Sequence, residues 1–135
     1  MKKKLISILI TNHNKNNFLK KNLKKCLNQT YKNYEIILYD DRSNDGSINT
    51  VKKFKNIKII ENKKNYKSSP LNQLRGIMKA FKKSKGKLVC FLDADDYFFK
   101  NKLKLINNFF EKHKNKNILF DLPISKEKKI QIKKK

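Results

Sequence analysis

Three carboxylates lie close together in the last third of the chain, at Asp93, Asp95 and Asp96. The residues just before them, 88–92, are apolar, and Gly86 precedes this run. A short apolar run of this kind predicts a strand that is buried on both faces of a parallel sheet. The acidic side chains would then lie at the carboxyl end of the strand, where open α/β sheets bind their ligands.

Carboxylates this close repel one another, and the repulsion is relieved by a bound cation or by protonation of one of them. Mg²⁺ or Mn²⁺ would suit such a site, because hard divalent ions prefer oxygen ligands and commonly bind together with a substrate phosphate. The acidic cluster therefore predicts a metal–diphosphate site. The same residues would also suit the solvated N-terminal end of a helix, where aspartate is favoured. This segment alone leaves both interpretations open.

The rest of the chain alternates between predicted strands and predicted helices, which favours a parallel sheet with helices on both faces. The strands are expected from apolar, β-branched runs, and the helices from apolar residues at helical spacing. The predicted strands are 5–11, 34–39, 57–60, 88–92 and a fifth at 118–120, and the predicted helices are 17–29, 47–55, 69–81 and 97–112.

The same spacing predicts which side chains are buried. In the helix that starts at Ser69-Pro70, with Ser69 as its cap, the expected buried face is Leu71, Leu74, Ile77, Met78 and Phe81. Asp45 or Ser47 is expected to cap the helix at 47–55. Cys26 and Cys90 also fall on apolar faces, which predicts buried free thiols in a reducing compartment.

Polar residues follow three of the predicted strands, and parallel strands bring their carboxyl ends to one rim of the sheet. The chain has only three glycines, so neither a dinucleotide fingerprint nor a P-loop is present. If a nucleotide binds at this rim, carboxylates and a metal must hold its phosphates. The rim residues are Thr11, Asn12 and His13 after the first strand, Asp40 and Asp41 after the second, and Asp93, Asp95 and Asp96 after the fourth.

The composition is strongly basic, with 35 Lys and Arg residues against 11 Asp and Glu and a formal net charge of +24. Such a charge favours binding to nucleic acid or to an anionic membrane surface. However, Arg42 and Arg75 are the only arginines, while Lys, Asn and Ile are abundant throughout, which is typical of an AT-rich genome. Proteins that read bases use more arginine, because its planar guanidinium pairs with guanine. We therefore expect a solvated basic surface and no specific nucleic-acid partner.

The length predicts one domain at residues 1–124, followed by a Lys-rich tail at 125–135 that we expect to be disordered. Residues 1–10 imitate a signal peptide, but their apolar part is too short and polar residues follow it. No apolar run approaches the length of a membrane span. We expect a cytoplasmic protein, with peripheral contact between the tail and an anionic membrane as an open alternative.

Several segments form motifs in a fixed order and spacing. They are SILITNHN at 7–14, LNQTYKNYEII at 27–37, DDRSNDGS at 40–47, and KGK at 85–87 followed by FLDADD at 91–96. Together they resemble the nucleotide-binding half of family 2 glycosyltransferases, over residues 4–110. The resemblance implies the GT-A fold, a Rossmann-like three-layer sandwich with a mostly parallel sheet, here truncated.

The resemblance also implies a donor that is a nucleotide-diphospho-sugar, commonly linked to UDP. By their positions, Thr11 and His13 would line the base pocket, although the family often has Tyr at position 13. Asp41 would accept a hydrogen bond from the imide of the base, with Asp40 as its neighbour.

The acidic cluster takes on a specific role under the same resemblance. Asp93 and Asp95 would form the DXD motif, which contacts the ribose and a divalent metal, Mg²⁺ or Mn²⁺. Asp96 would share the metal role, and the resemblance leaves open whether Asp95 or Asp96 is the direct ligand.

The chain departs from the family pattern in two places. Gln73 and Leu74 stand where the family usually has an Arg-Asn pair. Inverting members take a general base from their acceptor-binding half, and the carboxylates that remain here match no such motif. Those carboxylates are Glu111, Asp121 and Glu127.

Three functions therefore remain open. The first is the donor half of an inverting, metal-dependent glycosyltransferase of cell-surface glycan synthesis with a glycan or lipid-linked acceptor, and it comes from a truncated or split gene or needs a second chain that supplies the acceptor half. The second is a nucleotide-sugar-binding module without transfer activity. The third is a basic nucleic-acid-binding protein that has kept an old fold.

Overall fold

The computed structural model describes residues 3–64 and 68–120 of the chain. Its centre is a parallel four-stranded sheet with the strand order β3-β2-β1-β4. The alternation of strands with connecting helices produces this sheet, because parallel neighbours need a crossover between them. The predicted α/β class is confirmed. The strands are β1 (Ile6–Asn12), β2 (Tyr34–Asp40), β3 (Ile57–Glu61) and β4 (Leu88–Asp93).

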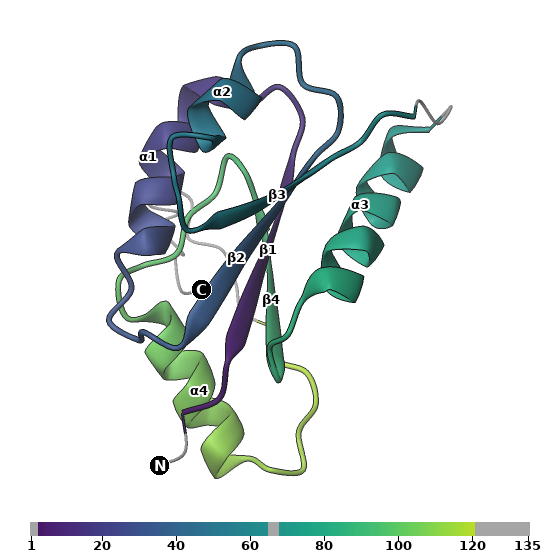
Figure 1. The fold of residues 1–135 in the computed structure, drawn as a ribbon. Coiled ribbons are helices and arrows are strands. Elements are labelled where there is room, and N and C mark those ends of the chain that lie inside the picture. The colour runs from purple at the N-terminus through teal and green to yellow at the C-terminus, as the bar shows by residue number, and fades with distance from the viewer. Residues whose placement is uncertain (1–2, 65–67, 121–135) are drawn as a thin grey trace, which may run out of the picture.

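Helices cover both faces of the sheet and give the molecule three layers (Figure 1). Ile8 of β1 points into the larger core, where it joins Leu23 and Leu103 from two of the helices. Leu9, the next residue along the strand, points to the opposite face and joins Ala80 of the third layer. The helices of the larger core are α1 (Asn16–Leu27), α2 (Ser47–Val51) and α4 (Lys102–Lys112), and α3 (Ser69–Lys83) covers the other face.

α3 contacts the sheet through small residues, not through the large apolar residues that its spacing predicts. Gly76 and Ala80 are buried, and a Cβ atom at Gly76 would lie 2.2 Å from the ring of Tyr39 on β2. The missing side chain lets the helix approach β2 closely, so the large apolar residues flank the contact. Four of the five side chains predicted to be buried are 48–54% exposed, namely Leu71, Leu74, Met78 and Phe81.

β4 lies at an edge of the sheet. Within the described residues it pairs only with β1, and Phe91 on the α3 side of the sheet is 59% exposed. The predicted fifth strand at 118–120 is wrong, because these residues have no regular structure and no strand lies beside them in the described part of the chain. The outer edge of β4 therefore pairs with no strand within residues 3–64 and 68–120.

The start of the last helix differs from its prediction, since α4 begins at Lys102 and not at residue 97. Residues of the loop before β2 hold this segment in place. Gln29 Nε2 donates to the carbonyl of Phe99 at 3.0 Å, and the Thr30 N–H donates to the carbonyl of Lys100 at 2.9 Å. The Phe99 carbonyl also accepts from the Lys102 N–H at 3.0 Å, so a turn tied to a distant loop precedes the helix.

Other boundaries shift by a few residues. α1 runs from 16 to 27, α2 ends at Val51, and Ser68, not Ser69, is the residue that precedes α3. Cys26 and Cys90 are free and buried as predicted, and burial raises the pKa of each thiol to about 11. The predicted tail at 125–135 lies outside the described residues. In the described ranges, no helix combines the length and the apolar character needed to cross a bilayer.

Asp45 binds the N-terminal ends of two helices and not only the one predicted. One carboxylate oxygen accepts from the backbone N–H and the hydroxyl of Ser47, and the other accepts from the Asn16 N–H at 2.8 Å. Burial alone would raise the pKa of Asp45, but these hydrogen bonds hold it below its ordinary value. Asp45 therefore connects α1 to α2 as an ionised group.

Asp45→Ala is expected to lower the free energy of unfolding by about 1–2 kcal/mol at neutral pH, because both helix ends lose a capping acceptor. A depressed pKa stabilises the fold above the unfolded-state pKa, and this contribution disappears as the pH falls through the lower folded-state value. The difference between the two proteins should therefore shrink below about pH 4. Urea unfolding followed by circular dichroism at several pH values measures it, with the exposed Asn49→Ala as control. A difference that stays constant as the pH falls would contradict this account.

Candidate functional site

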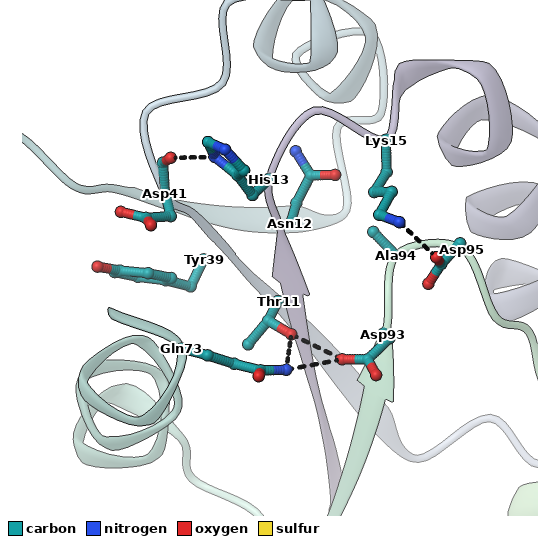
Figure 2. Close-up of a pocket in the computed structure, with 10 residues that line it drawn as sticks. All are labelled: Thr11, Asn12, His13, Lys15, Tyr39, Asp41, Gln73, Asp93, Ala94 and Asp95. Carbon is teal, nitrogen blue, oxygen red and sulfur yellow. Dashed lines mark hydrogen bonds and ion pairs between the residues drawn. The ribbon is translucent and has the colours of Figure 1, made fainter. Parts of the chain in front are cut away.

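A pocket of about 300 Å³ opens at the carboxyl end of the sheet, where β1, β2 and β4 finish (Figure 2). Thr11 of β1 is aligned with Tyr39 on one side and with Asp93 on the other, so the central strand brings both neighbours to one rim. α3 closes the pocket with Gln73. The lining residues are Thr11, Asn12, His13, Lys15, Tyr39, Asp41, Gln73, Asp93, Ala94 and Asp95.

Six of the eight rim residues named from the sequence line this one pocket, namely Thr11, Asn12, His13, Asp41, Asp93 and Asp95. Asp40 and Asp96 are not among the lining residues. Segments separated by tens of residues in the sequence therefore meet at the rim, as the parallel topology requires.

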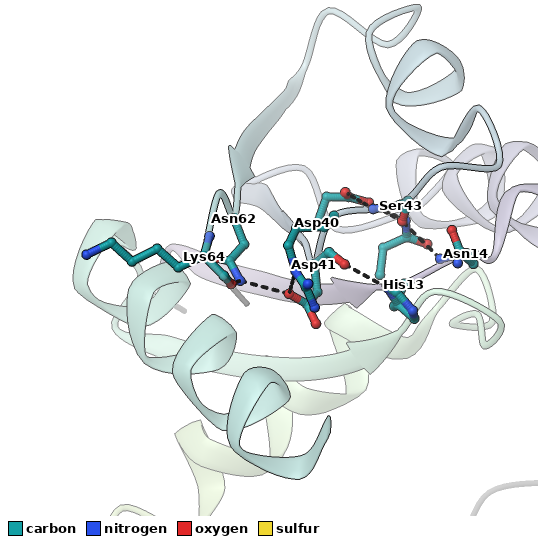
Figure 3. Close-up of polar contacts among 9 residues, drawn as sticks. His13, Asn14, Asp40, Asp41, Ser43, Asn62 and Lys64 are labelled. Atoms are coloured by element: carbon teal, nitrogen blue, oxygen red, sulfur yellow. Dashed lines mark hydrogen bonds and ion pairs between the residues drawn. The ribbon is translucent and has the colours of Figure 1, made fainter. Parts of the chain in front are cut away.

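On the β2 side of the pocket, His13 and Asp41 form a pair (Figures 2 and 3). The His13 Nδ1 atom lies 2.7 Å from the backbone carbonyl oxygen of Asp41. Because a carbonyl only accepts, Nδ1 must carry the proton of this hydrogen bond. The contact fixes the orientation of the imidazole ring beside the pocket.

The Asp41 side chain is 13% exposed and is held by two donors on the same oxygen. Asn62 Nδ2 donates to Oδ1 at 2.8 Å, and Arg42 Nε lies 3.3 Å from it. Burial would raise the pKa of Asp41, but these hydrogen bonds and the charges of Arg42 and His13 lower it below its ordinary value. Within the described part of the chain no hydrogen bond reaches Oδ2, so this ionised oxygen can accept from a ligand N–H.

Asp40 is 2% exposed and belongs to the scaffold of the rim. It accepts hydrogen bonds from Asn12 Nδ2 at 2.6 Å and from the Ser43 N–H at 2.9 Å, which shapes the turn after β2 (Figure 3). Direct contact between Asp40 and a nucleotide stays a prediction that this burial does not favour.

Asn12 lies in the pocket wall with 3% exposure. Its amide nitrogen binds Asp40 and Ser43, whereas its Oδ1 is buried and has no partner among the described residues. A buried acceptor without a donor costs about 1–3 kcal/mol. Asn12 Oδ1 is therefore an acceptor in the wall of the pocket that the described residues leave unsatisfied.

On the β4 side, the aspartates take different partners. Asp93 Oδ1 accepts from Thr11 Oγ1 at 2.9 Å and from Gln73 Nε2 at 3.2 Å. Asp95 Oδ2 forms an ion pair with Lys15 Nζ at 2.7 Å (Figure 2). The turn that carries both is fixed by the Ala94 N–H, which donates to the Thr11 carbonyl at 3.1 Å.

The charges of these groups shift their proton affinities in opposite directions. The hydrogen bond from Lys15, together with its charge, lowers the pKa of Asp95 against the opposing effect of burial, and Asp95 in turn raises the pKa of Lys15. Burial and the charges of Asp95 and Asp93 raise the pKa of Asp96. The like-charge repulsion expected from the sequence is therefore present and is relieved at Asp95 by a lysine.

The donor set suits a hard divalent ion only if other ligands complete its shell. Among residues 3–64 and 68–120, no three His, Cys, Asp or Glu side chains are placed to hold a metal together, which differs from the predicted three-aspartate cluster. Asp93 and Asp95 lie in the same pocket, but they take separate partners, and Asp96 does not line it. Mg²⁺ commonly binds through one or two carboxylates plus phosphates and water, and the carboxylates present fit that mode.

Some lining residues gave little or no signal in the sequence. Lys15 is one lysine among many, and Tyr39 is predicted only as a strand residue. Gln73 stands at a position where the family resemblance expects an arginine, so only that resemblance draws attention to it.

Comparison with known proteins identifies the family of this chain. The family model "Glycosyl transferase family 2" matches residues 7–135. The chain belongs to glycosyl transferase family 2. This assignment confirms the resemblance drawn from the motifs, and the sheet and its covering helices form the N-terminal half of a GT-A fold.

Two family 2 relatives illustrate the match. The chain is 35% identical over 110 residues to the Escherichia coli UDP-Glc:alpha-D-GlcNAc-diphosphoundecaprenol beta-1,3-glucosyltransferase WfaP, covering 82% of this chain and 43% of that protein. It is 36% identical over 110 residues to an uncharacterized glycosyltransferase of Rickettsia bellii, covering 80% of this chain and 15% of the other. The chain thus spans less than half the length of these relatives.

Solved structures agree with the fold. The S. aureus TarS 1–349 structure in complex with UDP-GlcNAc superposes with a TM-score of 0.73 at 24% identity, covering 81% of this chain and 32% of that one. The mannosyltransferase PcManGT of Pyrobaculum calidifontis, solved with GDP-Man and Mn²⁺, gives a TM-score of 0.66 at 16% identity, covering 80% and 32%. At these identities the likeness concerns the fold.

Proposed function

We propose that this chain is the donor-binding half of an inverting glycosyltransferase and that its pocket holds a nucleotide-diphospho-sugar, with UDP as the nucleotide. The observation that carries the proposal is the convergence of Thr11, His13, Asp41, Asp93 and Asp95 on one pocket. The comparisons support it, because WfaP is named for a UDP-Glc donor and the TarS structure contains UDP-GlcNAc.

In this proposal the β2 side of the pocket binds the base. The ionised Asp41 accepts a hydrogen bond from the ring N–H of uracil at Oδ2, which no hydrogen bond from residues 3–64 or 68–120 reaches. The His13 ring, fixed by the Asp41 carbonyl, offers a flat surface against which a base can stack. Thr11 lies at the floor of the pocket between the two sides.

The β4 side binds the ribose and the diphosphate. Asp93, oriented by Thr11 and Gln73, accepts from a ribose hydroxyl. Asp95 holds a divalent metal, Mg²⁺ or Mn²⁺, together with diphosphate oxygens and water. When bound, the metal supplies positive charge that stabilises the departing nucleoside diphosphate.

The transfer step needs an acceptor and a base that removes the proton of its hydroxyl as the anomeric carbon is attacked. No residue of the pocket is assigned to that role, and the chain spans 43% of WfaP. We propose that the acceptor-binding half of the enzyme, which these residues do not include, supplies this base. The name of WfaP specifies a diphosphoundecaprenol-linked acceptor. We therefore propose that the acceptor is a lipid-linked sugar of cell-surface glycan synthesis. In this proposal the enzyme binds that acceptor at the cytoplasmic face of the membrane.

The direct test is UDP binding, measured by isothermal titration calorimetry with and without Mn²⁺. We expect saturable binding that Mn²⁺ strengthens, and Asp41→Asn should weaken it about tenfold, because the neutral amide loses a charge-assisted hydrogen bond. Glu61→Gln serves as the control, since this half-exposed side chain on β3 does not line the pocket. No UDP binding, or equal effects of the two substitutions, would contradict the proposal.

Two further measurements separate the remaining functions. Release of sugar from a UDP-sugar, slow in the absence of an acceptor, distinguishes a transferase from a module that only binds. Binding to an oligonucleotide with a steep salt dependence, together with indifference to UDP, would favour the nucleic-acid alternative that the charge of +24 suggests.

A further inference from the structure

Lys15 is the one lysine or arginine among the described residues that line the pocket, where it faces three carboxylates, Asp41, Asp93 and Asp95. Gln73, which α3 contributes, is neutral. A diphosphate therefore meets a wall whose negative charges outnumber its positive ones. To bind a diphosphate, the pocket must therefore use the charge of Lys15, or a further cation must enter together with the diphosphate.

The ion pair of Lys15 is weak enough to exchange. Nζ lies 2.7 Å from Asp95 Oδ2, but the two side chains are 43% and 38% exposed. An ion pair at such exposure contributes little net free energy and is screened by salt. The lysine stem is long and flexible, so the ammonium can move by several ångströms without a change in the backbone.

Asp95 cannot serve Lys15 and a divalent ion equally well at the same time, because the two cations repel each other at one carboxylate. The divalent ion carries twice the charge and prefers carboxylate oxygen. When it binds Asp95, the ammonium of Lys15 is released next to the diphosphate that the ion brings. A lysine acts as a point charge and binds phosphate in any orientation.

We propose that Lys15 is an exchangeable counterion of the pocket: it neutralises Asp95 when the pocket is empty, and it moves to a diphosphate oxygen of the donor when a divalent ion takes Asp95. This inference rests on the proposed function and adds to it a residue that the family motifs do not single out. The proposal requires that Lys15 weaken the binding of the metal when no nucleotide is present. It also requires that Lys15 strengthen the binding of the nucleotide when the metal is present.

Lys15→Met tests these opposite signs, because methionine keeps much of the length of the stem and removes the charge. Binding of Mn²⁺ alone, measured by electron paramagnetic resonance, should tighten by about fivefold. Binding of UDP in saturating Mn²⁺, measured by calorimetry, should weaken by about tenfold, within the range that charge-assisted hydrogen bonds produce. A merely structural ion pair would not move the two constants in opposite directions.

Two further variants complete the design. Lys20→Met removes the same charge from an exposed position on α1, the helix that follows Lys15, and should change neither constant by more than about twofold, because salt screens distant charges. Lys15→Arg keeps the charge and should retain both constants within about threefold. Failure of the unmodified protein to bind UDP would remove the proposed function, whereas normal UDP binding with no opposite shifts in Lys15→Met would overturn only the role of Lys15.

Discussion

Asp95→Asn should abolish the strengthening of UDP binding by Mn²⁺ and reduce the affinity in saturating Mn²⁺ by about 100-fold. The amide keeps the size of the side chain but removes the anionic oxygen that we propose as the metal ligand. A charged interaction of this kind contributes about 3 kcal/mol, which corresponds to that factor. The measurement is UDP calorimetry over a range of Mn²⁺ concentrations.

The matched control for this variant is Asp96→Asn, which makes the same change one residue along the chain. Asp96 does not line the pocket, so this variant should lose no more than about threefold in affinity. The pair of variants also decides which aspartate binds the ion. If Asp96→Asn loses more affinity than Asp95→Asn, Asp95 is not the metal ligand. That conclusion would hold even though the unmodified protein still binds UDP more tightly with Mn²⁺.

Gly76→Ala is expected to destabilise the fold by about 2–3 kcal/mol, which is the cost of forcing an extra group into a packed core. At an exposed position in a helix, replacing glycine by alanine would stabilise the fold by about 1 kcal/mol. The sign of the change in unfolding free energy therefore distinguishes a packed position from an open one. The added Cβ would lie 2.2 Å from the Tyr39 ring, which is 1% exposed and has little room to move. Thermal and urea unfolding measure the effect.

A second substitution shows whether the clash is with Tyr39. Tyr39→Leu removes the ring, so Gly76→Ala should cost much less in that background than in the unmodified protein. Because Tyr39 also lines the pocket, Gly76→Ala should weaken UDP binding as well. A stabilising effect of Gly76→Ala, or full additivity of the two changes, would contradict the described packing.

The fold was largely predictable because two simple signals agree along the chain. Apolar runs bounded by polar loops define the strands, and their alternation with helical spacing defines the parallel sheet. The rim residues followed from topology alone: Thr11, Asp41 and Asp93 lie far apart in sequence, but each lies within one residue of the end of a parallel strand. Their chemistry was predictable only with the family motifs, because carboxylates after strands are also common in turns.

The parts that escaped prediction depend on contacts between distant segments. Helical spacing cannot show that α3 would contact β2 through Gly76, because that requires knowledge of the Tyr39 ring beneath it. The turn before α4 is bound by hydrogen bonds from Gln29 and Thr30, some 70 residues earlier. Lys15 was missed because its partner Asp95 becomes its neighbour only after the chain has folded.

The outer edge of β4, which pairs with no strand of the described residues, has a practical consequence for every assay described above. An open strand edge beside the exposed Phe91 is a template on which a second molecule can add its own strand. The mutual repulsion of molecules that each carry a charge of +24 opposes this pairing, but the repulsion weakens as salt shortens the Debye length. Added salt would therefore weaken oligonucleotide binding and promote aggregation together. A salt titration on this protein has meaning only when light scattering is recorded on the same sample.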